Sequence, residues 1–195
     1  MKFILFCLFL QLFFVSFTFA QDVIEWSPDY KVSISDFQSK STQIGHVNQY
    51  SILLAAHMDF SFHMSTYEFM LTKNFNSKVA TTFTRSASVL IAPDSNFAQK
   101  LVKYAQLSFD LTELYARKFR KNLYESKGFL SEVNFFQEAY KPIEIEYNAR
   151  IAEIGKLTGL GQSEVRIEEA HQQVLKEIEE LPDFCKTCKP KKKKK

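Results

Sequence analysis

The segment LVKYAQLSFDLTELYARK, residues 101–118, decides the fold of this chain of 195 residues. Its apolar side chains recur at helical spacing, and the pattern continues on both sides of the segment. Pro93 followed by Asp94 or Ser95 is a typical helix start, and Gly128 is a typical stop. The sequence therefore predicts one unusually long helix in the middle of the chain.

The residues before this helix predict a sheet. From Ile52 to Met64 apolar residues occupy the even positions and mostly polar residues the odd ones, which is typical of one long, half-buried strand. Residues 23–37 predict two short strands separated by Ser27-Pro28-Asp29, and further strands are expected at 67–71, 79–83 and 87–91.

The residues after the long helix, from Phe129 to Leu181, are rich in Glu, Lys, Gln, Leu and Ile. They predict two more helices, divided by Thr158-Gly159-Leu160-Gly161, and Pro142 either starts or kinks the first of them. Strands followed by helices indicate an α+β fold, in which a mainly antiparallel sheet packs against a long central helix and two further helices.

The N-terminus has the pattern of a secretory signal peptide. Lys2 is followed by an apolar run and by the small residue Ala20, after which we expect cleavage. Residues 1–20 are therefore predicted to be removed, and the protein to be exported to the periplasm or secreted. Residues 21–184 are expected to form a single domain, and residues 185–195 a tail.

Charge is concentrated in that tail. Its eleven residues contain seven lysines and no acid, whereas residues 21–184 carry 17 basic against 22 acidic residues. The domain is therefore not basic, and a folded nucleic-acid-binding surface is not indicated. The lysines could hold the protein weakly at an anionic surface, but a solvated end without a partner is the favoured interpretation.

Cys185 and Cys188 are the only cysteines outside the predicted signal peptide, and they form one C-x-x-C motif. One such pair supplies two ligands, whereas a structural zinc ion requires four. In an exported protein the pair is expected to form a local disulfide or to stay reactive toward another thiol.

The central helix resembles that of a bacterial family of predicted secreted zinc-dependent proteases, whose helix has the approximate pattern L-x-x-H-E-Q-x-H-F-D-I-x-E-x-Y-A-R-x-x-R. Eight residues fall on this pattern in one register: Gln106, Phe109, Asp110, Glu113, Tyr115, Ala116, Arg117 and Arg120. The resemblance covers roughly residues 23–125 and implies a zincin-like frame. An ordinary amphipathic helix without such an ancestor is the alternative.

The departures fall on the residues that would carry the chemistry. In H-E-x-x-H, histidines one helical turn apart bind Zn²⁺ together, and the glutamate polarises the metal-bound water. Here those positions hold Tyr104, Ala105 and Ser108, which are poor ligands and supply no base. The resemblance therefore implies a frame without its metal or its general base, and no cofactor is expected.

Other candidate sites are weaker. His57 and His63 lie on one face of the predicted strand but are too far apart to share a metal, and Glu168 with His171 forms a single E-x-x-H. No nucleophile elbow or phosphate-binding loop is present, so no catalytic residue is nominated. We expect a non-catalytic protein that binds a protein, peptide or envelope component. The alternative is a secreted hydrolase or metallopeptidase whose ligands, zinc included, involve unaligned positions.

Overall fold

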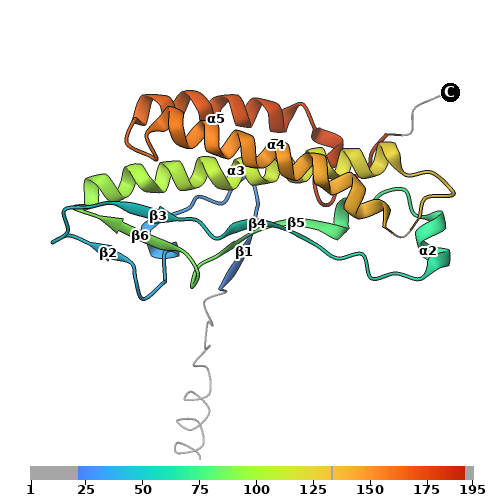
Figure 1. Cartoon of the computed structure of the whole chain (residues 1–195), viewed down its shortest axis with the longest axis horizontal. Helices are drawn as coiled ribbons and strands as arrows, with labels where there is room; N and C mark the ends of the chain where they lie inside the picture. The colour runs from blue at the N-terminus through green and yellow to red at the C-terminus, as the bar shows by residue number, and fades with distance from the viewer. Residues whose placement is uncertain (1–21, 133, 192–195) are drawn as a thin grey trace, which may run out of the picture.

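The computed structural model describes residues 22–132 and 134–191, and the predicted signal peptide lies outside them. The fold is α+β with a long central helix, α3 (Ser95–Ser126). Two helices, α4 (Phe135–Thr158) and α5 (Glu164–Glu179), cover α3 on the side away from the strands (Figure 1). The three elements follow the predicted helices closely, and the side chain of Asp94 caps α3 by accepting a hydrogen bond from the backbone of Phe97.

The strands form two small sheets. In the first, β5 (Val79–Thr84) lies between β1 (Val23–Glu25) and β4 (Ala56–Phe60), and both pairs are antiparallel. In the second, β6 (Val89–Ala92) lies between β2 (Gln43–Ile44) and β3 (Ser51–Leu53). The β3 pair is antiparallel, but β2 runs parallel to β6.

The single long strand expected from Ile52 to Met64 is wrong. The chain pairs with β6 as β3, breaks at Leu54-Ala55, and then pairs with β5 as β4. It changes partner because a turn at residues 85–88 separates β5 from β6, and Ser88 Oγ accepts a hydrogen bond from the backbone N–H of Ala55. The alternation in burial nevertheless persists except at Phe60, which is 41% exposed, because the other even-numbered side chains still pack toward the core.

Two further expected strands are helical. Residues 67–71 lie in α2 (Thr66–Leu71), because Ser65 caps this helix by accepting a hydrogen bond from the backbone of Glu68. The second strand expected within residues 23–37 is replaced by the 3₁₀ helix η1 (Ile34–Asp36). The buried carboxylate of Asp36 holds this turn by accepting hydrogen bonds from both the backbone N–H and the hydroxyl of Ser33.

Helix α3 forms the centre of the core, since it is buried on nearly all sides between Tyr104 and Arg117. An aromatic cluster packs between its C-terminal half, β4 and the start of α4, where the rings of Phe62 and Phe136 stack 3.6 Å apart. Pro142 lies inside α4 and does not start it. No helix among the described residues is long and apolar enough to cross a membrane.

The C-terminal segment returns to the sheet. After α5, the short 3₁₀ helix η3 (Pro182–Phe184) leads to the C-x-x-C motif. There Lys186 forms an ion pair with Glu25 of β1, so nearly the first and the last described residues of the chain meet. This contact and η2 (Asn76–Lys78), whose Asn76 amide donates to the carbonyls of Asp183 and Cys188, hold the C-terminal segment in place.

Candidate functional site

The three residues that align with H-E-x-x-H lie in the core, Tyr104 on the side toward α4 and Ala105 on the side toward the strands. Tyr104, Ala105 and Ser108 are 6%, 0% and 2% exposed. The Tyr104 hydroxyl packs against Gly155 of α4, where a Cβ atom would lie 3.4 Å from it. Burial raises the pKa of Tyr104. These residues therefore serve as packing groups.

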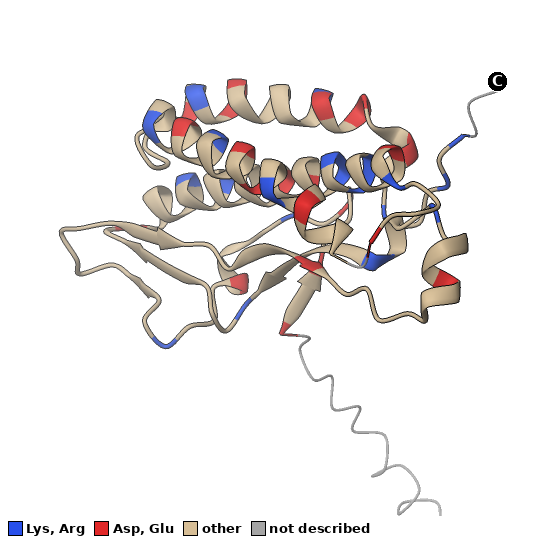
Figure 2. Ribbon diagram, turned by 45° about the vertical axis from the view of Figure 1, so that its right-hand side comes forward, with Lys and Arg blue, Asp and Glu red and all other residues tan. Residues whose placement is uncertain are grey.

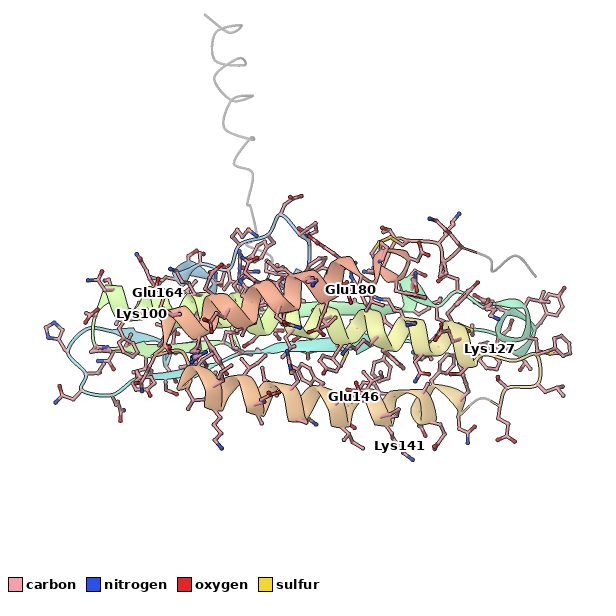
Figure 3. All side chains as sticks on the ribbon, turned by 90° about the horizontal axis from the view of Figure 1, so that it is seen from above. Lys100, Lys127, Lys141, Glu146, Glu164 and Glu180 are labelled. Carbon is pink, nitrogen blue, oxygen red and sulfur yellow. A yellow bond between two sulfur atoms is a disulfide. The ribbon has the colours of Figure 1, made fainter. Side chains whose placement is uncertain are left out.

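Ser108 is occupied within its own helix, since its hydroxyl donates a hydrogen bond to the carbonyl of Tyr104 at 3.0 Å. One turn further on, the Thr112 hydroxyl contacts the Tyr147 hydroxyl of α4. These contacts direct this face of α3 toward α4. In the view from above, α3 runs between α4 and α5 (Figure 3).

The opposite face of α3 carries a buried polar stripe. Its members recur alternately every four and every three residues, which aligns them along one face of a helix. All of them are at most 9% exposed. The polar stripe consists of Gln106, Asp110, Glu113, Arg117 and Arg120.

At one end of the polar stripe, Asp110 collects three side chains from different elements. Its carboxylate accepts hydrogen bonds from the indole N–H of Trp26 at 2.7 Å and from the Gln106 amide at 3.0 Å. His171 Nε2 of α5 lies 2.7 Å from the same carboxylate. Gln106 in turn accepts a hydrogen bond from the backbone N–H of Val32. Asp110 therefore connects β1, the following loop and α5 to the central helix.

Glu168 and His171, the E-x-x-H pair of the sequence, do not share a site. His171 points inward to Asp110, whereas Glu168 is exposed and contacts Gln172 on the surface of α5. His57 is also exposed and lies beside Asp59 and Thr82 at the sheet. Within residues 22–132 and 134–191, no group of three or more His, Cys, Asp or Glu side chains is placed to hold a metal ion.

At the other end of the polar stripe, Glu113 pairs with two arginines. Its carboxylate accepts hydrogen bonds from Arg117 Nε at 3.0 Å, from Arg120 Nη1 at 2.9 Å and from the Thr81 hydroxyl of β5 at 2.8 Å. Glu113 and Arg120 are 2% and 1% exposed. Such a buried pair requires that each charge be fully hydrogen-bonded, and both partners meet this condition.

The two arginines also hold the C-terminal segment. Arg117 Nη1 donates to the carbonyls of Ile178 and Leu181, while Arg120 Nη1 donates to the carbonyl of Phe184. These carbonyls lie at the end of α5, just before η3 and at the end of η3; those of Ile178 and Leu181 also accept hydrogen bonds from the backbone N–H groups of Leu181 and Phe184. The arginines therefore fix where the chain runs after α5.

A cavity of about 370 Å³ opens beside this network. Its lining includes Trp26 and Pro28 after β1, Arg117 on α3, and Lys186 and Thr187 in the C-terminal segment. The guanidinium of Arg117 lies over the Trp26 ring, 5.5 Å from its centroid, in a cation–π arrangement. The Lys186–Glu25 ion pair lies in the same lining and joins its two sides.

Arg117 keeps free donors toward this cavity. Nε and Nη1 are engaged, but Nη2 has no acceptor within the described residues. Among the described residues, Asn76 Oδ1 is the only buried side-chain N or O atom without a hydrogen-bond partner. Since Nη2 of Arg117 also lacks a partner, this atom must be accessible to solvent. The free Nη2 of Arg117 thus carries two N–H groups, each of which can donate a hydrogen bond to an acceptor oxygen such as that of a carboxylate.

Cys185 and Cys188 form a disulfide that closes a four-residue loop at the edge of the cavity. The loop is fixed to the rest of the protein by Asn74 and Asn76, whose amides donate to the carbonyl of Cys188. Its role in this structure is therefore to shape the wall of the cavity that carries Lys186 and Thr187.

Sequence reasoning identified the residues of the polar stripe as matches to a motif but missed that they form one network. The signal was present as polar side chains at alternating spacings of four and three on a helix that is otherwise apolar. Trp26 and the carbonyls near Leu181 could not be connected to the stripe without the tertiary structure. The chain matches none of the protein-family models, curated proteins or solved structures with which it was compared.

Proposed function

We propose that this chain is an exported, non-catalytic binding protein built on a frame like that of the zinc-dependent peptidases. Its ligand is a protein, peptide or envelope component that presents a carboxylate to Arg117. One observation carries the proposal: the residues at the motif positions needed for catalysis are buried in the core, while the remaining motif residues hold an arginine with free donors in a cavity.

The side chains at the motif positions support the absence of catalysis. Ala105 has no group that could act as a base, and Ser108 uses its hydroxyl within the helix. Tyr104 with a raised pKa stays neutral at neutral pH, and a neutral phenol is a poor ligand for Zn²⁺.

The surroundings of Arg117 support a carboxylate ligand. Glu113 is already neutralised by two arginines, so it does not oppose an incoming anion. Trp26 and Pro28 offer an apolar surface beside the guanidinium. A cavity of about 370 Å³ suits a side chain or the end of a peptide better than a folded surface.

A hydrolase is the second candidate, and the Asp110–His171 pair is the observation in its favour. An imidazole oriented by a carboxylate can act as a general base. However, Asp110 is shared with Trp26 and Gln106, and no described hydroxyl or thiol forms a hydrogen bond with His171. The contacts of this pair therefore favour a structural role.

Metal analysis separates the two candidates. The protein purified from the exporting cell is expected to contain no stoichiometric zinc, and a chelator is expected to leave its melting temperature unchanged. Zinc at one equivalent, with a lower melting temperature after chelation, would exclude the non-catalytic proposal.

Ligand binding is tested with N-acetyl-L-leucine and its amide, which differ only in the carboxylate. The acid should raise the melting temperature and the amide should not. Thr187→Tyr, which fills the cavity without touching the buried network, should abolish the effect, whereas Thr66→Tyr on the exposed start of α2 should preserve it. Equal shifts with acid and amide would refute recognition of a carboxylate.

A further inference from the structure

Large apolar side chains project from one end of the molecule. Tyr67 and Leu71, one turn apart on α2, are 74% and 63% exposed. Phe129 and Leu130, in the loop between α3 and α4, are 65% and 88% exposed. Residues of this kind usually cover a core, and a group of them in solvent marks an interaction surface. We call these four residues the apolar tip.

The two segments of the apolar tip are neighbours in space. Phe69, the buried residue of α2, packs against Phe135 at the start of α4, and the ammonium of Lys127 lies 4.3 Å from its ring centroid. Figures 1 and 3 both place α2 at the end of the molecule where α3 ends and α4 begins. The segments that carry the four exposed side chains therefore lie at the same end of the molecule.

The basic tail leaves the protein at the same end. Asn74 and Asn76, shortly after α2, donate hydrogen bonds to the carbonyl of Cys188. Lys189 and Lys191 follow and are exposed, and in the sequence four more lysines come after them. Figures 1 and 2 draw α2 and the end of the described chain at the same end of the molecule. The apolar tip and the described part of the basic tail thus share this end.

We propose that this end of the protein docks on an anionic lipid surface, with the apolar tip inserted between headgroups and the lysine tail against their phosphates. Apolar insertion and basic charge together give stable attachment where one alone is weak. A tail of one charge sign fits a surface of uniform opposite charge. Glu68 and Glu132 are the acids within α2 and the loop, and they are outnumbered by the lysines. This inference does not rest on the cavity or its ligand.

The test is cosedimentation of the protein, in the form recovered from the exporting cell, with vesicles. Binding is expected to vesicles of equal parts phosphatidylcholine and phosphatidylglycerol, and to be much weaker with phosphatidylcholine alone. The double variant Phe129→Ser with Leu130→Ser should lower partitioning at least tenfold. Lys189→Gln with Lys191→Gln should lower it about fivefold for each lysine.

Matched variants act as controls. Ile145→Ser with Val165→Ser removes side chains that are 70% and 68% exposed elsewhere, and it should leave partitioning unchanged. Lys31→Gln with Lys40→Gln should do the same for charge. Equal binding to both vesicle types, or equal losses in tip and control variants, would overturn the proposal. So would a dimer in solution that the tip variant abolishes while vesicle binding stays absent.

Discussion

Both faces of α3 are buried, but their polar side chains are satisfied in different ways. On the face toward α4, Tyr104 and Ser108 pack closely and satisfy their polar atoms locally. On the opposite face, Asp110 binds Trp26 after β1 and His171 of α5, whereas Glu113 binds Thr81 of β5 and two buried arginines. One face is held by shape and the other by a polar network, so the two should respond differently to substitution.

The largest effect is expected from introducing the H-E-x-x-H residues into α3. Tyr104→His, Ala105→Glu and Ser108→His together would place an unpaired acid at a site that is 0% exposed. The cost should reach about 5 kcal/mol or more, comparable with the whole stability of a domain. Circular dichroism should show loss of cooperative melting, and zinc should not restore it. A folded variant that binds zinc would show that a metal site remains latent here.

On the polar face, Glu113→Gln should be the most damaging single change. It leaves Arg120, 1% exposed, without its counterion, which typically costs about 3–5 kcal/mol. Urea unfolding measures the loss. Glu138→Gln removes an exposed ion pair with Lys141 and should cost less than about 1 kcal/mol. Equal losses in the two variants would contradict the network.

Asp110→Asn should have an intermediate effect. The new amide would direct N–H donors at the amide of Gln106, which is itself a donor, so that hydrogen bond is lost. The expected cost is about 2 kcal/mol in the free energy of unfolding, measured with urea. Asp59→Asn at the exposed edge of the sheet is the control and should be near neutral. If Asp110→Asn left the free energy of unfolding unchanged, the contacts of Trp26 and His171 with residue 110 would not depend on the charge of the carboxylate.

Opening the disulfide should have a smaller effect, because the loop between Cys185 and Cys188 is very short. Chain entropy alone predicts a loss of about 2 kcal/mol at most. The melting temperatures of the wild type and of the double variant Cys185→Ser and Cys188→Ser are measured in the absence and in the presence of N-acetyl-L-leucine. The first pair of values reports stability, and the shift caused by the ligand reports binding. We expect ligand binding to weaken more than stability, since the loop forms a wall of the cavity. A change in stability alone would separate the loop from the site.

The smallest effect is expected for Ser108→Ala. The hydroxyl bonds only to its own helix, and alanine is the better helix former, so the free energy of unfolding should change by less than about 0.5 kcal/mol. Thermal melting and binding of N-acetyl-L-leucine should both resemble the wild type. A marked loss of binding would place Ser108 in a functional role that its surroundings do not suggest.

The helices could be predicted from the sequence because their signals are local. Asp94 before Ser95 and the glycines at 159 and 161 mark helix ends through their own backbone chemistry, and both ends lie where they were expected. The strands were harder. The alternation over residues 52–64 reports burial, which is correct, but it contains no information on which strand is the partner, so the break at Leu54-Ala55 was missed.

The candidate site was less predictable for the same reason. The matching residues from Gln106 to Arg120 were identified, but their meaning depends on Trp26 and on carbonyls at the end of α5, which are distant in sequence. The capping pattern Ser65-x-x-Glu68 was available and would have corrected the strand expected at α2. Local rules would have improved the prediction of the fold, whereas the candidate site is defined by tertiary contacts alone.

The contact between Lys186 and Glu25 has a consequence for how the protein matures. These residues are separated by 161 positions, and the carbonyls that satisfy Arg117 and Arg120 lie at residues 178–184. A growing chain that lacks those residues already pairs both arginines with Glu113 but leaves them without the carbonyls that complete their hydrogen bonds. The polar network and the cavity wall at Lys186 and Thr187 are therefore completed only when almost the entire chain is present.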